Sequence, residues 1–530
     1  MQQALGAELS QMLAARGVEV IFGVPGVHNQ EMYRGINQAG ITHVLARHEQ
    51  GAGFMADGYA RASGKPGVAY VITGPGLCNI MTPMGQAYSD SVPMLVISSC
   101  LDETAYRRGQ LHQMRDQLGA GAAVCDWSLL ADSPASAFGL VDRAFDEFTT
   151  ARPRPKHLQV PIHLLEGLTD PAPMPNLPGQ RVPAAVPDVG PITSLLNLAR
   201  RPLFIFGGGA KGNLWRQIVS QTGAATFTTY AGRGRVGAGY PLDFGPMLAR
   251  PGSAEVIASA DVVVAVGTEL AEVDLWRAHL GHAAPLVRVD TDPEVLADEQ
   301  RATVKLLADA ESVGHALWHA TQEAKPATGW SEEEITQTRT RWQAEVAAER
   351  PGVAPFARAL QQTLAPDVMI YSDMTQFAYV AKEIWQMDYP GHWHHPFGFG
   401  TLGYALPAGI GGAVARGGIG GGGRPTLVIA GDYGLQYTLP ELGVAVELGL
   451  SLPIIVWDNA RLKEIEESMQ RAQIAPNAVQ ARNPDFSALA QAYGAASARV
   501  TTPDALAEAV QAAFRTQGPT VIHASPGDML

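Results

Sequence analysis

Ile429-Ala-Gly-Asp432-Tyr-Gly434 closes one short run of apolar and β-branched residues, and Val456-Trp-Asp-Asn459-Ala-Arg461 closes the next. Both runs have the length of a strand, which predicts two neighbouring parallel strands joined by a crossover helix. Open parallel sheets bind ligands where the carboxyl ends of adjacent strands meet. We therefore expect the polar side chains that follow these strands, Asp432 and Asn459, at one ligand-binding edge.

The chemistry of that edge suits a divalent cation. A carboxylate, an amide oxygen and a backbone carbonyl provide half of an all-oxygen shell, which magnesium completes with phosphate oxygens and water. Gly431 and a helix that begins near Tyr433 would offer backbone N–H groups to a diphosphate. The alternative interpretation is that Asp432 is a turn aspartate that only caps a helix.

The same alternation of short strands and helices occurs three times along the 530 residues. It predicts an α/β protein with three doubly wound parallel-sheet domains, at residues 1–165, 192–325 and 350–530. Seven prolines between positions 165 and 191 indicate an extended, proline-rich linker over 166–191. The predicted strands are Val18–Val24, His43–Ala46, Val68–Thr73, Met94–Ser98, Pro202–Phe206, Ala225–Tyr230, Val262–Val266, Leu286–Asp290, Val368–Ser372, Thr426–Ala430, Pro453–Trp457 and Thr520–Ala524.

Composition argues against several classes of function. The net charge of −13, the pI of about 5.5 and the lack of a basic cluster argue against nucleic acid and anionic membranes as partners. No apolar run is long enough to span a bilayer, and the N-terminus lacks the pattern of a secretory signal. The three cysteines are too few for a disulfide framework, and we expect buried free thiols. These features predict a cytoplasmic protein.

A second informative segment is Arg47–Arg61 (RHEQGAGFMADGYAR), which we consider together with the motifs around Asp432 and Asn459. Together they resemble the thiamine-diphosphate enzymes of the acetolactate synthase and pyruvate decarboxylase group. The resemblance implies thiamine diphosphate bound through Mg²⁺, with Asp432, Asn459 and the carbonyl of Arg461 as metal ligands. It also places Glu49 against N1′ of the aminopyrimidine, where general acid–base chemistry activates the cofactor. The three domains are then pyrimidine-binding, central and diphosphate-binding.

Two residues depart from the family pattern. Tyr433 stands where the family usually has glycine or alanine, and Asp458 replaces the first of two paired asparagines. Neither change removes a ligand side chain, but Tyr433 leaves the packing beside the diphosphate open. It is also the one feature that favours a remote alternative, a catalytically inactive cofactor-binding paralogue.

Further matches to the family extend over most of the chain, at Phe22–Gly26, Thr73–Asn79, Asp373–Gln376 and Gly398–Pro407. By resemblance, Leu402 holds the cofactor in its bent conformation. The implied cofactor contacts, besides Glu49, are Pro25, Gly26, Thr73, Asn79, Thr375, Gln376, Gly400, Leu402, Gly431, Asp432, Tyr433, Gly434, Asn459, Leu462 and Ile465.

The resemblance also implies an oligomer and bears on a second cofactor. Relatives are homodimers or homotetramers in which the cofactor lies between the subunits. Some of them bind FAD in the central domain and others bind nothing there. We interpret the glycine-rich turn Phe206–Lys211 as structural, so FAD is not expected.

The type of reaction depends on residues near the reacting carbons. By position in the family motifs, His28, His112 and Gln113 face the cofactor. A neutral imidazole near pH 7 can relay a proton to the enamine that remains when CO2 departs. Acetolactate synthases carry a tryptophan nine residues after the metal-binding asparagine, and this chain has Ser468 there. We therefore expect non-oxidative decarboxylation of a 2-oxo acid, with carboligation or C–C cleavage as the alternative.

The helix that follows Asn459 bears on the substrate. Glu464 occupies the position that the family places over the thiazolium, and the surrounding pattern resembles that of 5-guanidino-2-oxopentanoate (2-ketoarginine) decarboxylases. Its carboxylate could pair with a guanidinium tail by charge-assisted hydrogen bonds, or it could serve as a proton donor. Glu466 and Glu467 are interpreted as a solvated acidic helix start.

Overall fold

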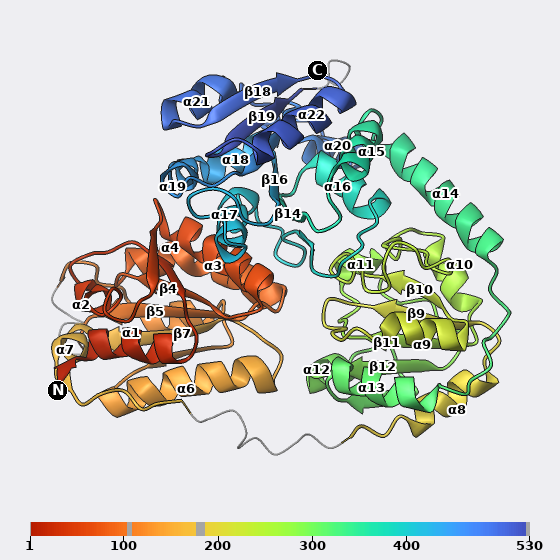
Figure 1. The fold of residues 1–530 in the computed structure, drawn as a ribbon, viewed down its shortest axis with the longest axis horizontal. Coiled ribbons are helices and arrows are strands. Elements are labelled where there is room, and N and C mark those ends of the chain that lie inside the picture. Colours follow the sequence, from red (N-terminus) through yellow and green to blue (C-terminus); the bar gives the residue numbers. More distant parts are fainter. Residues whose placement is uncertain (1, 103–108, 176–185, 526–530) are drawn as a thin grey trace.

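The computed structural model describes residues 2–102, 109–175 and 186–525, and it contains three parallel sheets, each in its own lobe (Figure 1). The predicted fold class, α/β with three doubly wound parallel sheets, is confirmed. Each predicted run forms a strand of one of these sheets. Their apolar runs are almost wholly buried, because helices cover both faces of a parallel sheet.

The first sheet has six strands in the order β3-β2-β4-β5-β7-β6. Helices α3 and α4 pack in one core on one face, and α1 and α6 pack in a second core on the other. The strands are β2 (Val20–Gly23), β3 (Thr42–Leu45), β4 (Gly67–Val71), β5 (Met94–Cys100), β6 (Trp127–Leu130) and β7 (Lys156–Pro161). The helices are α1 (Leu5–Ala15), α2 (Gln30–Arg34), α3 (Glu49–Ser63), α4 (Pro75–Ser89), α5 (Gln117–Ala122), α6 (Pro134–Thr150) and α7 (Ile162–Glu166).

The central sheet has five strands in the order β10-β9-β11-β12-β13. Its strands are β9 (Pro202–Phe206), β10 (Ala225–Thr228), β11 (Val262–Val266), β12 (Leu286–Asp290) and β13 (Val304–Leu307). Its helices are α8 (Gly190–Leu198), α9 (Trp215–Thr222), α10 (Ser253–Ala258), α11 (Glu272–Leu275), α12 (Pro293–Leu296) and α13 (Ala310–Ala320). The range expected for the linker, 166–191, contains β8 (Leu168–Thr169), which pairs antiparallel with β1 (Gln3–Ala4), and the start of α8.

A long helix, α14 (Glu332–Glu349), runs along the outside from the central lobe to the third (Figure 1). The third sheet has the order β15-β14-β16-β17-β19-β18. Its strands are β14 (Met369–Ser372), β15 (Trp393–His394), β16 (Thr426–Gly431), β17 (Pro453–Trp457), β18 (Ala496–Val500) and β19 (Thr520–Ala524). Its helices are α15 (Val353–Thr363), α16 (Gln376–Ile384), α17 (Ala405–Ala415), α18 (Asp432–Tyr437), α19 (Leu442–Glu447), α20 (Lys463–Arg471), α21 (Phe486–Tyr493) and α22 (Pro503–Phe514), with a 3₁₀ turn at Leu439–Glu441.

The first and third lobes meet where α3 packs against α17. A Cβ on Gly58 would lie 2.0 Å from Ala408 O, and a Cβ on Gly411 would lie 1.9 Å from Met55 O. Only glycine permits so close an approach of two helix backbones. Glu441 adds a polar contact across the same seam, because its carboxylate accepts the backbone N–H groups of residues 47 and 48.

The structure also bears on the burial of the cysteines and on whether a helix could cross a membrane. Cys100 and Cys125 are buried free thiols as expected, but Cys78 is exposed, so that prediction is wrong for one cysteine. It lies near the start of α4 and is not among the buried residues of that helix. Among the described residues, none of the helices is both long and apolar enough to cross a membrane.

Candidate active site

The predicted strand ends meet at one edge of the third sheet. β16 and β17 are hydrogen-bonded neighbours, and Gly431 stands opposite Trp457 in the register. Asp432 begins α18, and its side chain is buried. Asn459 lies two residues beyond β17 and is also buried. The parallel topology thus brings the carboxylate and the amide to adjacent strand ends, as the sequence predicted.

A residue that the sequence motifs did not reveal joins two acids at this edge. Asn483 Nδ2 donates hydrogen bonds to Asp432 Oδ2 at 2.6 Å and to Asp458 Oδ1 at 2.8 Å. Asp458 Oδ2 also lies 2.8 Å from His523 Nε2. Asn483 belongs to an irregular segment 51 positions after Asp432, so no local spacing marks it.

The two acids differ in ionisation because their surroundings differ. Burial and, to a smaller extent, the negative charge of Asp458 raise the pKa of Asp432 to about 6, although the hydrogen bond from Asn483 acts to lower it. Burial also acts to raise the pKa of Asp458, but hydrogen bonds from His523, the backbone of Ala460 and Asn483 outweigh it and lower the pKa. A divalent cation beside Asp432 would stabilise its charged form.

Asn459 connects this edge to the start of α16. Its Nδ2 donates to Gln376 Oε1 at 3.4 Å, and the backbone N–H of Arg461 donates to Asn459 Oδ1 at 3.3 Å. Thr375 and Gln376 are buried at the N-terminus of α16. A Cβ on Gly431 would stand 3.3 Å from Thr375 Cβ, so glycine lets the two loops approach closely. Four predicted cofactor contacts therefore lie close together: Thr375, Gln376, Gly431 and Asn459.

A buried carboxyl group, Asp373, organises the adjacent loop. It accepts hydrogen bonds from the backbone N–H groups of Gly403 at 2.9 Å and Met374 at 3.0 Å, and burial raises its pKa to about 7. A Cβ on Gly434 would lie 2.4 Å from Asp373 Oδ2, which explains the glycine at that position. Gly403, which follows the half-buried Leu402, lies against α18, because a Cβ on it would stand 2.7 Å from Tyr437 Cβ.

Tyr433, the departure from the family pattern, packs along its own helix. Its ring centroid lies 6.1 Å from that of Tyr437, one turn later, with the ring planes at 54°. Residues at i and i+4 share a helix face, so α18 itself supplies the partner for this ring. Tyr433 is half-buried, and Asp432 before it is buried.

The first lobe contributes a buried carboxylate at a helix start. Glu49 begins α3, is 9% exposed and accepts a hydrogen bond from Asn79 Nδ2 at 2.9 Å. Thr73 is fixed nearby by Ser99, whose Oγ lies 2.9 Å from Thr73 Oγ1. A Cβ on Gly26 would lie 2.3 Å from the side chain of the residue before Thr73, so the turns that follow β2 and β4 are in contact.

The two predicted histidines lie together, although they are 84 positions apart. The ring centroids of His28 and His112 are 4.8 Å apart in an edge-to-face arrangement. Burial lowers the pKa of His28, and the neighbouring His112 lowers it further. Within the described part of the chain, Nδ1 of each ring is buried without a hydrogen-bond partner. Gln113 follows directly, and its Oε1 accepts the backbone N–H of Gln110 at 3.0 Å.

The carboxylate of Glu464 is paired with the guanidinium of Arg350. Arg350 Nε and Nη2 donate to Glu464 Oε1 and Oε2 at 2.9 and 3.0 Å, which is the two-bond fork between guanidinium and carboxylate. The side chain of Glu464 remains 29% exposed. Leu462 precedes α20 and is half-buried, while the side chain of Ile465 is 52% exposed.

One expectation about this helix is wrong. Glu466 is buried rather than solvated, and its Oε2 lies 3.4 Å from both Arg461 Nη1 and Lys463 Nζ. The direction of α20 turns this residue inward, and the two cations compensate its charge. Glu467 is partly solvated, with 29% of its side chain exposed and its Oε1 3.6 Å from Lys463 Nζ.

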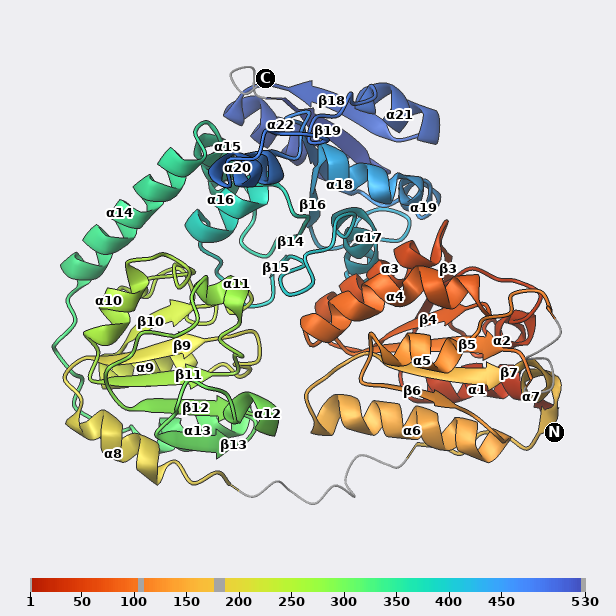
Figure 2. The same ribbon diagram turned by 180° about the vertical axis from the view of Figure 1, so that it is seen from behind.

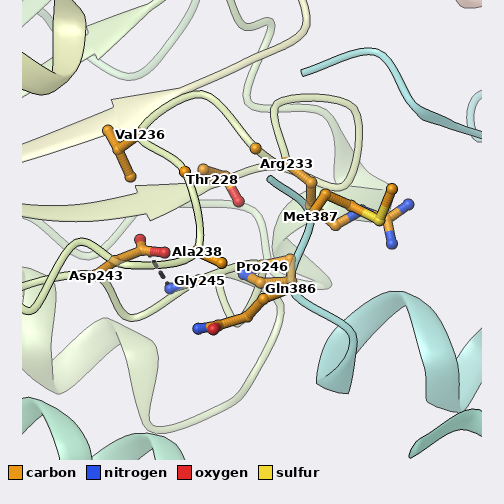
Figure 3. Close-up of a pocket in the computed structure, with 11 residues that line it drawn as sticks. Thr228, Arg233, Val236, Ala238, Asp243, Gly245, Pro246, Gln386 and Met387 are labelled. Carbon is orange, nitrogen blue, oxygen red and sulfur yellow. Dashed lines mark hydrogen bonds between the residues drawn. The ribbon is translucent and has the colours of Figure 1, made fainter. Parts of the chain in front are cut away.

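A small cavity lies between the central lobe and the residues that follow α16 (Figure 3). Its volume of about 10 Å³ is close to the space of one water molecule. Thr228 Oγ1 and Gln386 Nε2, from two of its lining residues, are buried without partners among the described residues. We expect an ordered water there and assign the cavity no ligand.

Comparison with known proteins identifies the family. Family profiles described as thiamine pyrophosphate (diphosphate) enzyme match residues 4–120 (N-terminal TPP binding domain), 189–317 (central domain) and 373–524 (C-terminal TPP binding domain). The chain belongs to the thiamine pyrophosphate enzymes. It is 40% identical to a probable 2-ketoarginine decarboxylase of Pseudomonas aeruginosa over 98% of this chain and 93% of that protein.

More distant relatives of this thiamine pyrophosphate enzyme are acetolactate synthases. The large subunit of isozyme 2 of Escherichia coli is 28% identical over 97% of this chain and 94% of its own length. The mitochondrial catalytic subunit of Saccharomyces cerevisiae is 25% identical over 98% of this chain and 80% of its own length.

The residues of this thiamine pyrophosphate enzyme fit a metal-bound diphosphate. The described residues contain no cluster of three or more His, Cys, Asp or Glu side chains suited to a metal ion. A cation at Asp432 would therefore depend on amide, carbonyl and phosphate oxygens, and this is the donor set that magnesium accepts. The raised pKa of the buried Asp432 marks a carboxylate whose charge lacks full compensation by the chain.

Proposed function

We propose that this enzyme decarboxylates a 2-oxo acid with a cationic tail, 5-guanidino-2-oxopentanoate, without oxidation. One observation carries the choice of substrate: the Glu464 carboxylate, in the helix that follows Asn459, already holds a guanidinium through two hydrogen bonds. The same carboxylate is partly open to solvent. The 40% identical relative is named as a probable 2-ketoarginine decarboxylase, which supports the same substrate.

The chain's part in holding the cofactor follows from the third sheet. Asp432, Asn459 and the carbonyl of Arg461 would hold Mg²⁺, and the backbone N–H groups at the start of α18 would face the diphosphate. When bound, thiamine diphosphate supplies the carbon nucleophile and the electron sink for loss of CO2. Thr375 and Gln376 border the same point from α16.

Two groups of the first lobe would handle protons. Glu49 is buried at the start of α3 and is oriented by Asn79, which suits a carboxylate that exchanges a proton with the aminopyrimidine. The rings of His28 and His112 are in contact, and the Nδ1 atom of each is buried without a partner in the part of the chain that the structure describes. The lowered pKa keeps His28 neutral near pH 7, so it would accept or relay a proton rather than carry a fixed charge.

The active unit would be a homodimer or a dimer of dimers. Large apolar side chains are exposed next to both halves of the site, with Val27 and Leu111 beside the histidines and Ile465 on α20. A second copy of the chain would remove them from water. A monomer that binds the cofactor with full affinity would contradict this assembly.

The test is a panel of 2-oxo acids given to the enzyme with thiamine diphosphate and Mg²⁺, with CO2 release and products measured. We expect the highest kcat/KM for the guanidino acid, with 4-guanidinobutanal as product. Glu464→Gln should lower that kcat/KM by about 10–100-fold, each factor of ten being ~1.4 kcal/mol, and should affect pyruvate much less. Glu467→Gln removes another partly exposed carboxylate of the same helix, one that pairs with Lys463, and is the control.

Other outcomes of the panel would lead to other assignments. Equal losses on both substrates in Glu464→Gln would make this residue a proton donor instead of a specificity residue. Acetoin or acetolactate from pyruvate would favour a carboligase, to which the 28% identical acetolactate synthase points. The absence of any turnover with intact cofactor binding would favour the inactive paralogue.

A further inference from the structure

The guanidinium on Glu464 belongs to a residue at a junction of helices. Arg350 is the first residue after α14, and α20, which carries Glu464, lies beside α15 and α16 in both views (Figure 2). The ion pair therefore ties the connecting helix between the central and third lobes to the proposed substrate helix. The two residues are 114 positions apart in the chain.

Arg350 has other partners within reach. Its Nη1 lies 3.7 Å from Glu349 Oε2, on a carboxylate that also accepts two hydrogen bonds from Arg250. Its guanidinium carbon lies 5.6 Å from the centre of the Tyr379 ring. Arg350 is 22% exposed and Glu464 29% exposed, so both partners border solvent.

We propose that Arg350 is a specificity residue that occupies the substrate's guanidinium site in the free enzyme and leaves when the substrate binds. The inference rests on the proposed function, because it needs a guanidino substrate that uses Glu464. The exchange replaces one guanidinium by another on the same carboxylate. Arg350 then turns toward the ring of Tyr379 and toward Glu349, whose carboxylate it would share with Arg250.

This exchange would discriminate between substrates. An apolar tail long enough to reach Glu464 would have to displace Arg350 without providing a cation. It would leave a partly buried carboxylate unpaired, which is strongly unfavourable. A short 2-oxo acid does not reach the pair and is unaffected. Arg350 therefore weakens binding of the guanidino substrate slightly and that of long apolar substrates much more.

The experiment measures kcat/KM of the holoenzyme for 5-guanidino-2-oxopentanoate, a long apolar 2-oxo acid and pyruvate in four proteins. These are wild type, Arg350→Met, Glu464→Gln and the double variant. Arg350→Met should raise kcat/KM for the guanidino acid about fivefold, mainly through a lower KM, and leave pyruvate unchanged. In the double variant, Arg350→Met should add nothing to the loss caused by Glu464→Gln. Arg341→Met removes an exposed arginine of α14, the helix that ends just before Arg350, and is the matched control.

The outcomes separate this inference from the proposed function. If the wild-type enzyme prefers the guanidino acid but Arg350→Met lowers or does not change its kcat/KM, Arg350 only positions Glu464 and the inference is overturned. If the wild-type enzyme shows no such preference, the proposed function itself fails. If Arg350→Met does not fold, Arg350→Lys replaces it. Lysine cannot form the two-bond fork, so it should raise kcat/KM about twofold, and a decrease would overturn the inference.

Discussion

Gly411→Ala should separate the two helices that join the first and third lobes. Gly411 lies in α17, and a methyl group there would stand 1.9 Å from Met55 O of α3, whereas ordinary contacts begin near 3.4 Å. The obstacle is backbone, so no side-chain rotation relieves it. The helices would have to move apart by about 1.5 Å, and α3 carries Glu49 at its first position.

The size of the effect follows from two opposing terms. Overpacking of this kind destabilises a protein by about 3 kcal/mol. Alanine is the better helix residue by ~1 kcal/mol, so the free energy of unfolding should fall by about 2 kcal/mol. Gly139→Ala in α6 is the matched control, because a Cβ at this helical glycine would meet nothing within 4 Å. The control should gain up to about 1 kcal/mol.

The assay is urea unfolding of both variants and wild type at one protein concentration, because self-association would change the apparent stability. Calorimetric titration with thiamine diphosphate and Mg²⁺ completes it, since a displaced α3 should weaken cofactor binding. If Gly411→Ala is as stable as Gly139→Ala and binds the cofactor as wild type does, the close helix contact does not exist in solution.

Two further predictions concern charged groups. Asp432→Ala should abolish binding of thiamine diphosphate in the presence of Mg²⁺, because it removes the one anionic ligand. Asp485→Ala, at the exposed start of α21, should not. Full occupancy in Asp432→Ala, measured by calorimetry, would exclude the metal assignment. Burial raises the pKa of Glu441 from 4.5 to about 7, so the folded protein favours the protonated state of this side chain. The contribution of Glu441 to the free energy of unfolding is therefore complete below about pH 4.5 and is lost as pH rises through 7. The unfolding free energy should therefore decline over that range by up to about 3 kcal/mol, and Glu441→Gln should flatten the profile; an unchanged slope in the variant would show that Glu441 is not the group responsible.

Four of the strands that the sequence missed share one physical reason. β6, β13, β15 and β18 lie at sheet edges, where one side faces solvent or a loop and the residues are partly polar. β7 is interior but contains Lys156 and His157, both buried. Lys156 is compensated by Asp126 at 2.6 Å and Glu147 at 2.8 Å, and His157 lies between two serine hydroxyls at 2.7 Å. Partners from distant segments compensate the burial of these polar residues. The hydrophobic pattern of the strand alone cannot reveal those partners.

The sequence by itself determined the three parallel sheets and the edge that carries Asp432 and Asn459. Apolar strand runs and the glycines after them are local features, and parallel topology then fixes where the strand ends meet. Only the tertiary structure decided that Asn483 bridges two acids, that Glu466 is buried and that Arg350 occupies Glu464. These contacts join segments whose relative placement depends on how lobes and helices pack. Such pairs of polar residues produce no hydrophobic periodicity, so the sequence pattern does not reveal them.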